Sequence, residues 1–507
     1  MRLEIKVDKA IPRLAWCVGL VRGQSVAVAH CGPWVESAGG GIVEGVWSGD
    51  FAAGRFDEAV TFWGTGARPV DDGILIAAST FTINPVFMVR TGDRLWVSNS
   101  LLRLLAHSGV RLDLAYPYYE IDLMTVMFGL SRYRRTIPTA SGDAIHVRYA
   151  TNLLVDRDLV VHERSKRVPG PMNDFDAYAG FLRDELTRVI ANGADPARRR
   201  PMKPLATIST GYDSPACAVL AHGAGCREAI TLTTARDAYV DRDDSGRRIA
   251  ETLGLSVIEI DPYAGRATRP WSVEALFLAA GCGAGDIIFA SALERLAGRV
   301  VVVGLHGDTT WAMKRRERVE DLRRGDPSFG SMNEARLEYG FAVVSPAAFG
   351  TARYDAIHRI TVAPGMARWV LPGTDYNRPI PRRIVEEAGV DRAWFGQTKM
   401  AVSTPHAGTG SEYIPIANVF APETVARFES FIAERAPHRQ SWRRLKHRAL
   451  WTIFRSYKIG WLLRRLAPAA TADYILWKYS KPWATQQWLM PWAVAELIDQ
   501  GTILKPR

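Results

Sequence analysis

The amino-acid sequence predicts an α/β protein in three parts, and three patterns along the chain carry that prediction. Short alternating apolar runs and glycine-rich turns fill residues 1–168, strands alternate with helices over 174–420, and residues 421–507 are basic, tryptophan-rich and helical in pattern. The 507 residues are enough for about two to four domains. A content of 47% hydrophobic and 23% charged residues is typical of a globular protein and excludes a disordered or collagen-like chain.

The first part, residues 1–168, is predicted to be β-rich. Runs of Val, Ile, Trp and Phe alternate with glycine turns, and the tripeptide from Thr91 to Asp93 separates two such runs as a hairpin turn would. A Pro/Gly break at 168–172 ends this part. Asn173 or Asp174 then stands where a helix over 174–192 would need its N-cap.

The second part predicts a doubly wound parallel sheet, because buried β-branched strands alternate with helices. The expected strands cover 204–208, 228–234, 255–260 and 300–304, and the expected helices cover 215–224, 244–253, 271–280 and 287–297. In such sheets ligands bind at the loops that leave the carboxyl ends of the strands. The loops after Ile208 and after Val303 are therefore the candidate site.

The first of these loops runs from Ser209 through Thr210, Gly211, Tyr212 and Asp213 to Ser214. Backbone N–H groups in a tight turn, together with a helix N-terminus, attract an anion, and Ser209 and Ser214 add hydroxyl donors. Asp213 suits a phosphate only if a magnesium ion lies between them. The loop lacks the G-K-[ST] of a Walker A motif. The alternative is an ordinary helix start with Asp213 or Ser214 as the N-cap.

The second loop, Gly304 to Thr309, again places glycines and a carboxylate after a buried strand. Asp308 is positioned to complete a magnesium site with Asp213. The alternative is that both loops are ordinary strand-to-helix turns, which often contain Gly and Asp.

The pattern S-x-G-x-D-S followed by G-x-x-G-D resembles the asparagine synthetase family of ATP pyrophosphatases (PP-loop proteins). Further segments resemble that family in the same order along the chain: Asn84 to Phe87, Val97 to Leu105, Phe128 to Thr136, Ser141 to Asp143, and Gly389 to Lys399. The resemblance implies a degenerate, glutaminase-like Ntn-type β-sandwich over 1–168. It implies an adenine nucleotide α-hydrolase-like ATP-pyrophosphatase domain over 174–420, followed by a helical region over 421–507.

The family likeness also implies an activity: an ATP- and Mg²⁺-dependent, AMP-forming ligase that adenylates a carboxylate and forms an amide with an amine, in specialised metabolism. By the same likeness, Ser209, Gly211, Asp213 and Ser214 would hold pyrophosphate and magnesium, Asp308 would be the second metal ligand, Gly304 and Gly307 would allow close backbone approach, and Lys399 would balance charge on the adenylate. The substrate would be a small-molecule or peptide carboxylate with its amine.

Two departures from the family pattern open alternatives. Arg2 follows the initiator Met where glutamine-hydrolysing members have a nucleophilic Cys, so we expect no glutamine hydrolysis. β-Lactam synthetases and lasso-peptide cyclases share this loss, which leaves a macrolactam cyclase acting on a precursor peptide as an alternative. Leu305 replaces the usual Glu or Tyr, so His306 becomes a candidate base, or else only a hydrogen-bonding residue of the loop.

Two further consequences follow from the replaced second loop. Glu338 or Tyr339 is another potential source of a base, from a helix that follows the loop. Leu305 and Thr309 also motivate a third possibility, a pseudoenzyme or binding subunit that keeps the fold without turnover.

The C-terminal part concentrates the positive charge of the chain. Residues 435–472 contain ten Lys and Arg residues and no Asp or Glu, against a net charge of +11 for the whole protein. Trp442, Leu445, Ala449 and Ile453 fall at helical spacing within this stretch. Three interpretations remain open: an amphipathic helix on an anionic membrane surface, docking of an acidic partner, and a packed helix with a solvated basic face. Nucleic acid is disfavoured because no binding motif accompanies the charge.

Cysteine usage and hydropathy bear on location. The five cysteines lie far apart with no C-x-x-C pair, which is typical of a reducing compartment, and no run of about 18 apolar residues predicts a membrane span. We expect a cytoplasmic protein, with peripheral membrane attachment left open by residues 435–472. The sequence predicts no oligomeric state.

Overall fold

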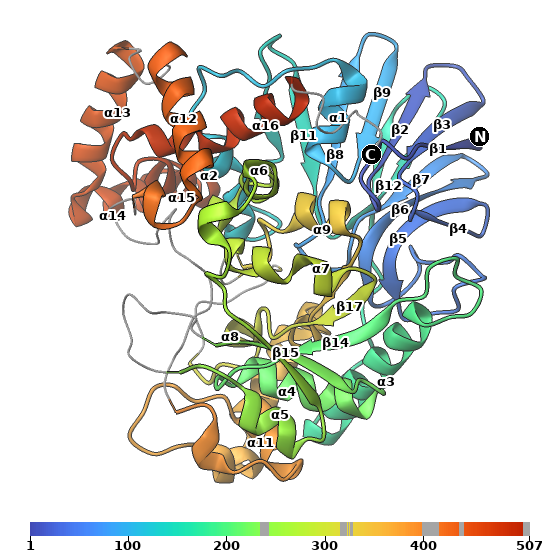
Figure 1. Ribbon diagram of the computed structural model, residues 1–507, viewed down its shortest axis with the longest axis vertical. Helices are drawn as coiled ribbons and strands as arrows, with labels where there is room; N and C mark the ends of the chain where they lie inside the picture. Colours follow the sequence, from blue (N-terminus) through green and yellow to red (C-terminus); the bar gives the residue numbers. More distant parts are fainter. Residues whose placement is uncertain are drawn as a thin grey trace.

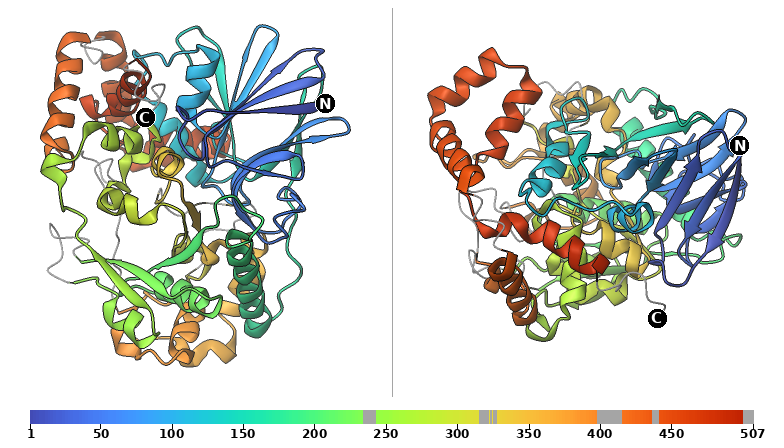
Figure 2. Two further views of the ribbon diagram at one scale, coloured as in Figure 1. Left: turned by 45° about the vertical axis from the view of Figure 1, so that its right-hand side comes forward. Right: turned by 90° about the horizontal axis from the view of Figure 1, so that it is seen from above.

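The computed structural model describes residues 1–233, 243–314, 322, 324, 328–397, 415–435 and 441–499. It is a mixed α/β structure with three sheets in the described chain and a group of helices at the C-terminal end (Figure 1). The two sheets nearest the N-terminus lie at one side of the molecule, and the C-terminal helices lie at the other side (Figure 2).

Two sheets form the first 165 residues and pack on each other. The first has the order β1 (Arg2–Val7), β3 (Val26–Cys31), β2 (Trp16–Val21), β9 (Arg94–Ser98), β8 (Val86–Thr91), β11 (Ala144–Arg148) and β10 (Thr136–Pro138). The second has the order β13 (Val161–Ser165), β12 (Thr151–Val155), β7 (Gly73–Ala77), β6 (Phe62–Val70), β5 (Gly41–Trp47) and β4 (Glu36–Ala38). Val18 and Val97 of the first sheet share one buried cluster with Ile74 and Leu153 of the second. The β-rich prediction is therefore confirmed.

The turn after Thr91 and the helix after the Pro/Gly break are both present where the sequence predicts them. Thr91 pairs with Arg94 across a two-residue turn whose Gly92 has φ +60°, a conformation that glycine adopts without strain. The helix predicted after the Pro/Gly break is α3 (Phe175–Gly193). Its N-cap is Asp174, whose carboxylate accepts a hydrogen bond of 2.8 Å from the Ala177 amide.

The third sheet is parallel and has the order β16 (Ser256–Ile260), β15 (Glu228–Leu232), β14 (Lys203–Thr207), β17 (Arg299–Val302) and β18 (Ala342–Val344). The chain runs outward from β14 through β15 to β16 and then returns to β17 on the other side of β14. The strand order therefore reverses between β14 and β17, which makes their carboxyl ends the topological switch point where such sheets bind ligands.

The helices of this region confirm most of the predicted pattern. They are α4 (Asp213–Gly223), α5 (Arg247–Thr252), α6 (Trp271–Ala279), α7 (Leu293–Leu296), α8 (Gly307–Thr310), α9 (Asn333–Tyr339), α10 (Tyr354–Thr361) and α11 (Pro379–Glu387). The segment predicted as one helix over 287–297 is instead a 3₁₀ helix, η4 (Ile287–Ala292), followed by α7. Strand β18 was not predicted.

A buried ionic contact joins the N-terminal sheets to the parallel-sheet region. Arg336 of α9 donates to both carboxylate oxygens of Glu44 on β5, at 2.7 and 2.9 Å, and the two residues are only 3% and 1% exposed. Glu334, also on α9, accepts from the Ser100 hydroxyl (2.7 Å) and the Leu101 amide (2.9 Å) at the start of α1 (Leu101–Ser108). Burial raises the pKa of Glu334 to about 7.

The last part of the described chain is helical, as predicted: α12 (Pro422–Arg435), α13 (Ser441–Phe454), α14 (Tyr457–Leu466), α15 (Ala469–Lys478) and α16 (Leu489–Asp499). Helix α16 completes the core, because Trp492 is buried and its ring lies 5.2 Å from Phe428 of α12 and 6.5 Å from Trp271 of α6. Figure 1 shows α13 at the outer edge of the molecule. Among the described residues, no helix is both long enough and apolar enough to cross a membrane.

Candidate functional site

The two candidate loops meet at the switch point between β14 and β17. A Cβ atom added to Gly304 would lie 2.5 Å from the backbone nitrogen of Ser214, and one added to Gly307 would lie 2.4 Å from Cγ of Asp213. Both distances are shorter than the contacts that real Cβ atoms make. Only glycine at these two positions therefore allows the two loops to approach this closely. Asp213 and Asp308 therefore belong to two loops that adjoin each other.

The first loop is closed by its own hydroxyl groups. The Ser209 and Ser214 hydroxyls lie 2.9 Å apart, and the Gly211 amide donates to Ser209 Oγ at 3.2 Å. In the described chain Tyr212 is the N-cap of α4, and no side chain caps that helix. The alternative in which Asp213 or Ser214 serves as the N-cap is therefore wrong. Asp213 is the first residue of the helix, where its carboxylate lies at the positive end of the helix dipole.

A buried arginine that the sequence analysis missed lies between the two acidic loops. Arg378, 5% exposed, forms an ion pair with Asp213. Burial alone would lower the pKa of Arg378, but the carboxylates of Asp213 and Asp308 raise that pKa above its usual range. The Arg378 guanidinium thus interacts electrostatically with both carboxylates, and it contacts that of Asp213 directly.

A second missed residue holds the first loop from the other side. Asp244, buried just before α5, accepts from the Thr210 hydroxyl at 2.5 Å and from the Thr210 amide at 3.1 Å. Burial raises the pKa of Asp244, and the hydrogen bonds from Thr210 oppose that rise. Thr210 therefore fixes the first loop to Asp244.

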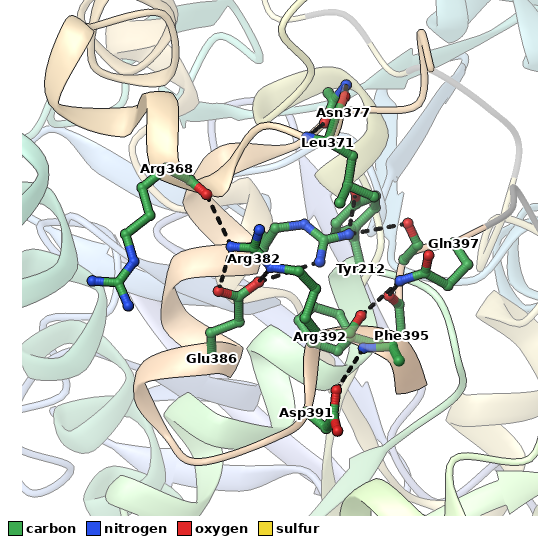
Figure 3. Close-up of polar contacts among 12 residues, drawn as sticks. Tyr212, Arg368, Leu371, Asn377, Arg382, Glu386, Asp391, Arg392, Phe395 and Gln397 are labelled. Atoms are coloured by element: carbon green, nitrogen blue, oxygen red, sulfur yellow. Dashed lines mark hydrogen bonds and ion pairs between the residues drawn. The ribbon is translucent and has the colours of Figure 1, made fainter. Parts of the chain in front are cut away.

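Helix α11 connects the first loop to the segment that leads toward Lys399 (Figure 3). Arg382, which is fully buried, donates to the Tyr212 hydroxyl at 2.7 Å and to the Gly396 carbonyl at 3.2 Å. The Gly396 amide in turn donates to the Thr210 carbonyl at 2.8 Å. A Cβ on Gly396 would lie 2.4 Å from the Tyr212 ring, so the segment is pressed directly against the loop.

Lys399 itself lies outside the described residues. The described chain before it ends at Gln397, whose side-chain amide donates to the carbonyls of Arg392 (2.6 Å) and Phe395 (3.0 Å). Arg392 is held in turn by Glu386 through contacts of 2.7 and 2.8 Å (Figure 3). The described part of this segment is thus anchored at the loop and on α11.

His306 occupies a constrained and buried position. It has φ +73°, a left-handed conformation that is strained for a non-glycine residue, and it is only 4% exposed. Its ring lies 4.8 Å from the ring of Phe81, a residue of the segment that connects β7 to β8. Burial lowers the pKa of His306 to about 4, so the imidazole is neutral at pH 7 and only weakly basic.

Leu305 lies in the second loop but has no ionisable side chain, and Glu338 and Tyr339, the other candidates for a base, lie away from both loops. Leu305 is buried, and its carbonyl accepts from Ser345 at 2.6 Å. Glu338 and Tyr339 end helix α9, and the next residue, Gly340, accepts from Gly298 just before β17. That position is at the amino ends of the parallel strands, opposite the loops. The hypothesis that Glu338 or Tyr339 supplies a base is wrong.

No protein-family model matches the chain, and no curated protein matches it either. Among the described residues, no group of three or more His, Cys, Asp or Glu side chains is arranged to hold a metal ion.

Proposed function

We propose that the protein is an ATP- and Mg²⁺-dependent, AMP-forming carbon–nitrogen ligase similar to asparagine synthetases, which adenylates a carboxylate and joins it to an amine without hydrolysing glutamine. One observation carries the proposal: Asp213 and Asp308 come from two glycine-containing loops that meet at the switch point of a parallel sheet. Ordinary strand-to-helix turns do not require two glycines of one loop packed against the start of the neighbouring helix.

The chemistry of the donor set fits magnesium and a polyphosphate. The carboxylates of Asp213 and Asp308 are oxygen ligands of the type that Mg²⁺ prefers. The N-terminus of α4, which is 11 residues long, and the hydroxyls of Ser209 and Ser214 suit the phosphate oxygens. Magnesium–ATP would supply the activating adenylyl group. Arg378 offers a permanent positive charge beside the same carboxylates, suited to a pyrophosphate leaving group.

Two further parts of the chain have supporting roles in this proposal. Lys399 is the candidate cation for the charge that develops on the adenylate, as its resemblance to the family lysine implies. Arg382 is a positioning residue, because it links Tyr212 of the loop to Gly396. The weak basicity of His306 argues for a neutral packing role, so the amine would reach the site already deprotonated or lose its proton to another group.

In the proposed enzyme, residues 1–168 are a degenerate glutaminase-like scaffold. The structure gives the thiols of this region little nucleophilic character: Cys17 and Cys31 are buried, and burial raises the pKa of the Cys31 thiol to about 12. A thiol with that pKa is protonated at pH 7 and is a poor nucleophile.

The first test is calorimetric binding of a non-hydrolysable ATP analogue to the full-length protein, with and without Mg²⁺. We expect binding that requires Mg²⁺ and disappears in Asp213→Ala and in Asp308→Ala. Asp184→Ala, on the exposed side of α3, is the matched control and should bind as the wild type does. Analogue binding that survives both site variants would contradict the proposal. Confirmed binding would justify a search for substrates by release of AMP.

A pseudoenzyme is the second candidate, and the Arg378–Asp213 ion pair is the observation that favours it. A guanidinium bound to the carboxylate competes with a metal ion for the same oxygens. If the wild type does not bind the analogue but Arg378→Met binds it with Mg²⁺, the ion pair closes the site and the pseudoenzyme is favoured. If the wild type binds, Arg378 must move when the metal arrives.

A further inference from the structure

Apolar side chains are exposed in one place above all others. In the described chain, eight of the thirteen large apolar side chains that are exposed lie on α13, on α14 or between them. They are Trp442, Leu445, Ile453, Tyr457, Ile459, Trp461, Leu462 and Leu466. The exposed fractions reach 72% for Trp442, 85% for Tyr457 and 76% for Leu466. A concentration of this kind marks an interaction surface, whereas single exposed apolar residues are normal.

The side of α13 opposite the exposed apolar residues is attached to the rest of the protein, and this attachment fixes the orientation of the helix. His447, fully buried, contacts the Tyr118 hydroxyl through Nδ1 and the Lys481 carbonyl through Nε2, both at 2.9 Å. The stripe of Trp442, Leu445 and Ile453 therefore faces outward, because it lies on the other side of the helix. The alternative in which this stripe packs into the protein is wrong. Figure 1 shows α13 at the edge of the molecule, where such a face is accessible.

Positive charge surrounds the same apolar side chains. The chain has no Asp or Glu between Glu434 and Asp473. The exposed cations from α13 to the end of α14 are Arg443, Arg444, Lys446, Arg448, Arg455, Lys458, Arg464 and Arg465. Four of them have contacts within the protein: Arg443 donates to the Ala115 carbonyl, Arg455 lies over the Trp451 ring, Arg465 lies over the Trp461 ring, and Arg464 lies 3.7 Å from Asp473. The other side chains extend the positive field outward.

We propose that α13 and α14 together bind the surface of an anionic lipid bilayer. Exposed Trp and Tyr side chains favour the headgroup region, Leu and Ile side chains enter the acyl boundary, and Lys and Arg pair with lipid phosphates. Helices of 14 and 10 residues are too short to cross the hydrocarbon core, so they would lie in the plane of the surface. The inference is independent of the proposed ligase activity.

Charge alone would also suit an acidic protein, but the apolar side chains favour lipid. Eight of them protrude from the convex surfaces of two helices, and a folded partner would need a rigid hollow to match each one. Lipid headgroups and chain ends adapt around protruding side chains at no such cost. Charge complementarity and the protruding apolar side chains therefore both favour an anionic lipid surface.

The test is flotation of the full-length protein with lipid vesicles. We expect binding to vesicles with about one-third anionic phosphatidylglycerol in phosphatidylcholine, and little binding to phosphatidylcholine alone. Trp442→Ser with Leu445→Ser should weaken binding by at least tenfold through lost apolar contact. Arg444→Glu with Arg448→Glu should weaken it by at least about 30-fold, and raised salt should have the same direction of effect.

Matched controls keep the two causes separate. Val7→Ser with Val362→Ser removes exposed apolar side chains elsewhere, and Arg157→Glu with Arg183→Glu reverses exposed charges elsewhere. Both pairs should bind as the wild type does. The substituted helix positions are all exposed, and unchanged thermal unfolding would show that the fold is intact. Point variants are used because truncation near residue 437 would also remove α16 and its buried Trp492.

Three results would overturn the inference. The first is that the wild type does not float with anionic vesicles. The second is that the control pairs weaken flotation as much as the helix pairs do. The third is that poly-glutamate binds while vesicles do not, which would assign the surface to an acidic polypeptide instead.

Discussion

Gly307→Ala adds one methyl group at the point where the second loop touches Asp213. The added Cβ would lie 2.4 Å from Cγ and 2.5 Å from Oδ1 of Asp213, about 1 Å short of ordinary contact. Gly307 begins α8 and does not have a positive φ, so the effect is steric and not one of backbone strain. The carboxylate or the loop must therefore move by about 1 Å.

The expected magnitudes follow from that overlap. Crowding a packed position by one methyl group costs about 1–3 kcal/mol of unfolding free energy. Displacing the residues that position a metal ligand lowers the metal affinity by about 10–100-fold. We expect Gly307→Ala to lower the urea midpoint and to weaken Mg²⁺-dependent binding of the ATP analogue by about 10–100-fold. Calorimetry and urea unfolding of the same preparations measure both effects.

Gly180→Ala is the control, because a Cβ at this position of α3 meets nothing within 4 Å. It should leave analogue binding unchanged and should not lower the urea midpoint, since Ala favours a helix more than Gly does. If Gly307→Ala matches this control in both measurements, the close approach of the two loops has no role in holding Asp213, and the reasoning fails.

Three other predictions concern parts of the fold that support the site. Arg336→Met should lower the unfolding free energy by about 3–5 kcal/mol, because it leaves the Glu44 carboxylate buried without its cation. Adding Glu44→Gln to the same chain removes that unpaired charge and should restore part of the lost stability. Urea unfolding measures both effects. Burial holds the pKa of His306 at about 4 in the fold against 6.5 when unfolded, so its neutral form stabilises the protein fully above pH 6.5. That contribution falls toward pH 4 by about 1.4 kcal/mol per pH unit, and His306→Gln should reduce the measured slope by this amount; an unchanged slope would contradict the burial. Arg382→Met should speed hydrogen exchange at the Gly396 amide, and equal protection in the variant would show that Arg382 does not anchor that segment.

Periodicity and turn chemistry were sufficient to predict the main elements. The β-branched runs after residue 203 predicted β14 to β17 in order, and Asp174 is the N-cap of α3, one of the two candidates that local sequence offered. Strand β18 is only three residues long, and a run that short carries no usable period. Asp286, the residue before η4, forms hydrogen bonds with Phe329 and Ser331, and such distant contacts cannot be predicted from a local pattern.

Residues of the candidate site were identified where they follow buried strands and were missed where no local pattern marks them. Asp213 and Asp308 follow buried strands, so the rule for parallel sheets located them. Arg378 is 165 residues from Asp213, and nothing in its local sequence distinguishes a buried arginine from an exposed one. The stripe on α13 shows the same limit: helical spacing identified Trp442 and Leu445 as one face, but only the tertiary position of His447 determines that this face points outward.

The separation of Arg378 from Asp213 has a consequence for synthesis of the protein. At about 5–20 residues per second, the 165 residues between them take on the order of 10–30 s to translate. During that interval the nascent chain carries its acidic loops before the guanidinium that balances them has been made. Like charges held close together repel, so this edge of the sheet should stay loosely packed until α11 docks. Closure of the site would then be one of the last steps of folding on the ribosome, well after the N-terminal sheets have emerged.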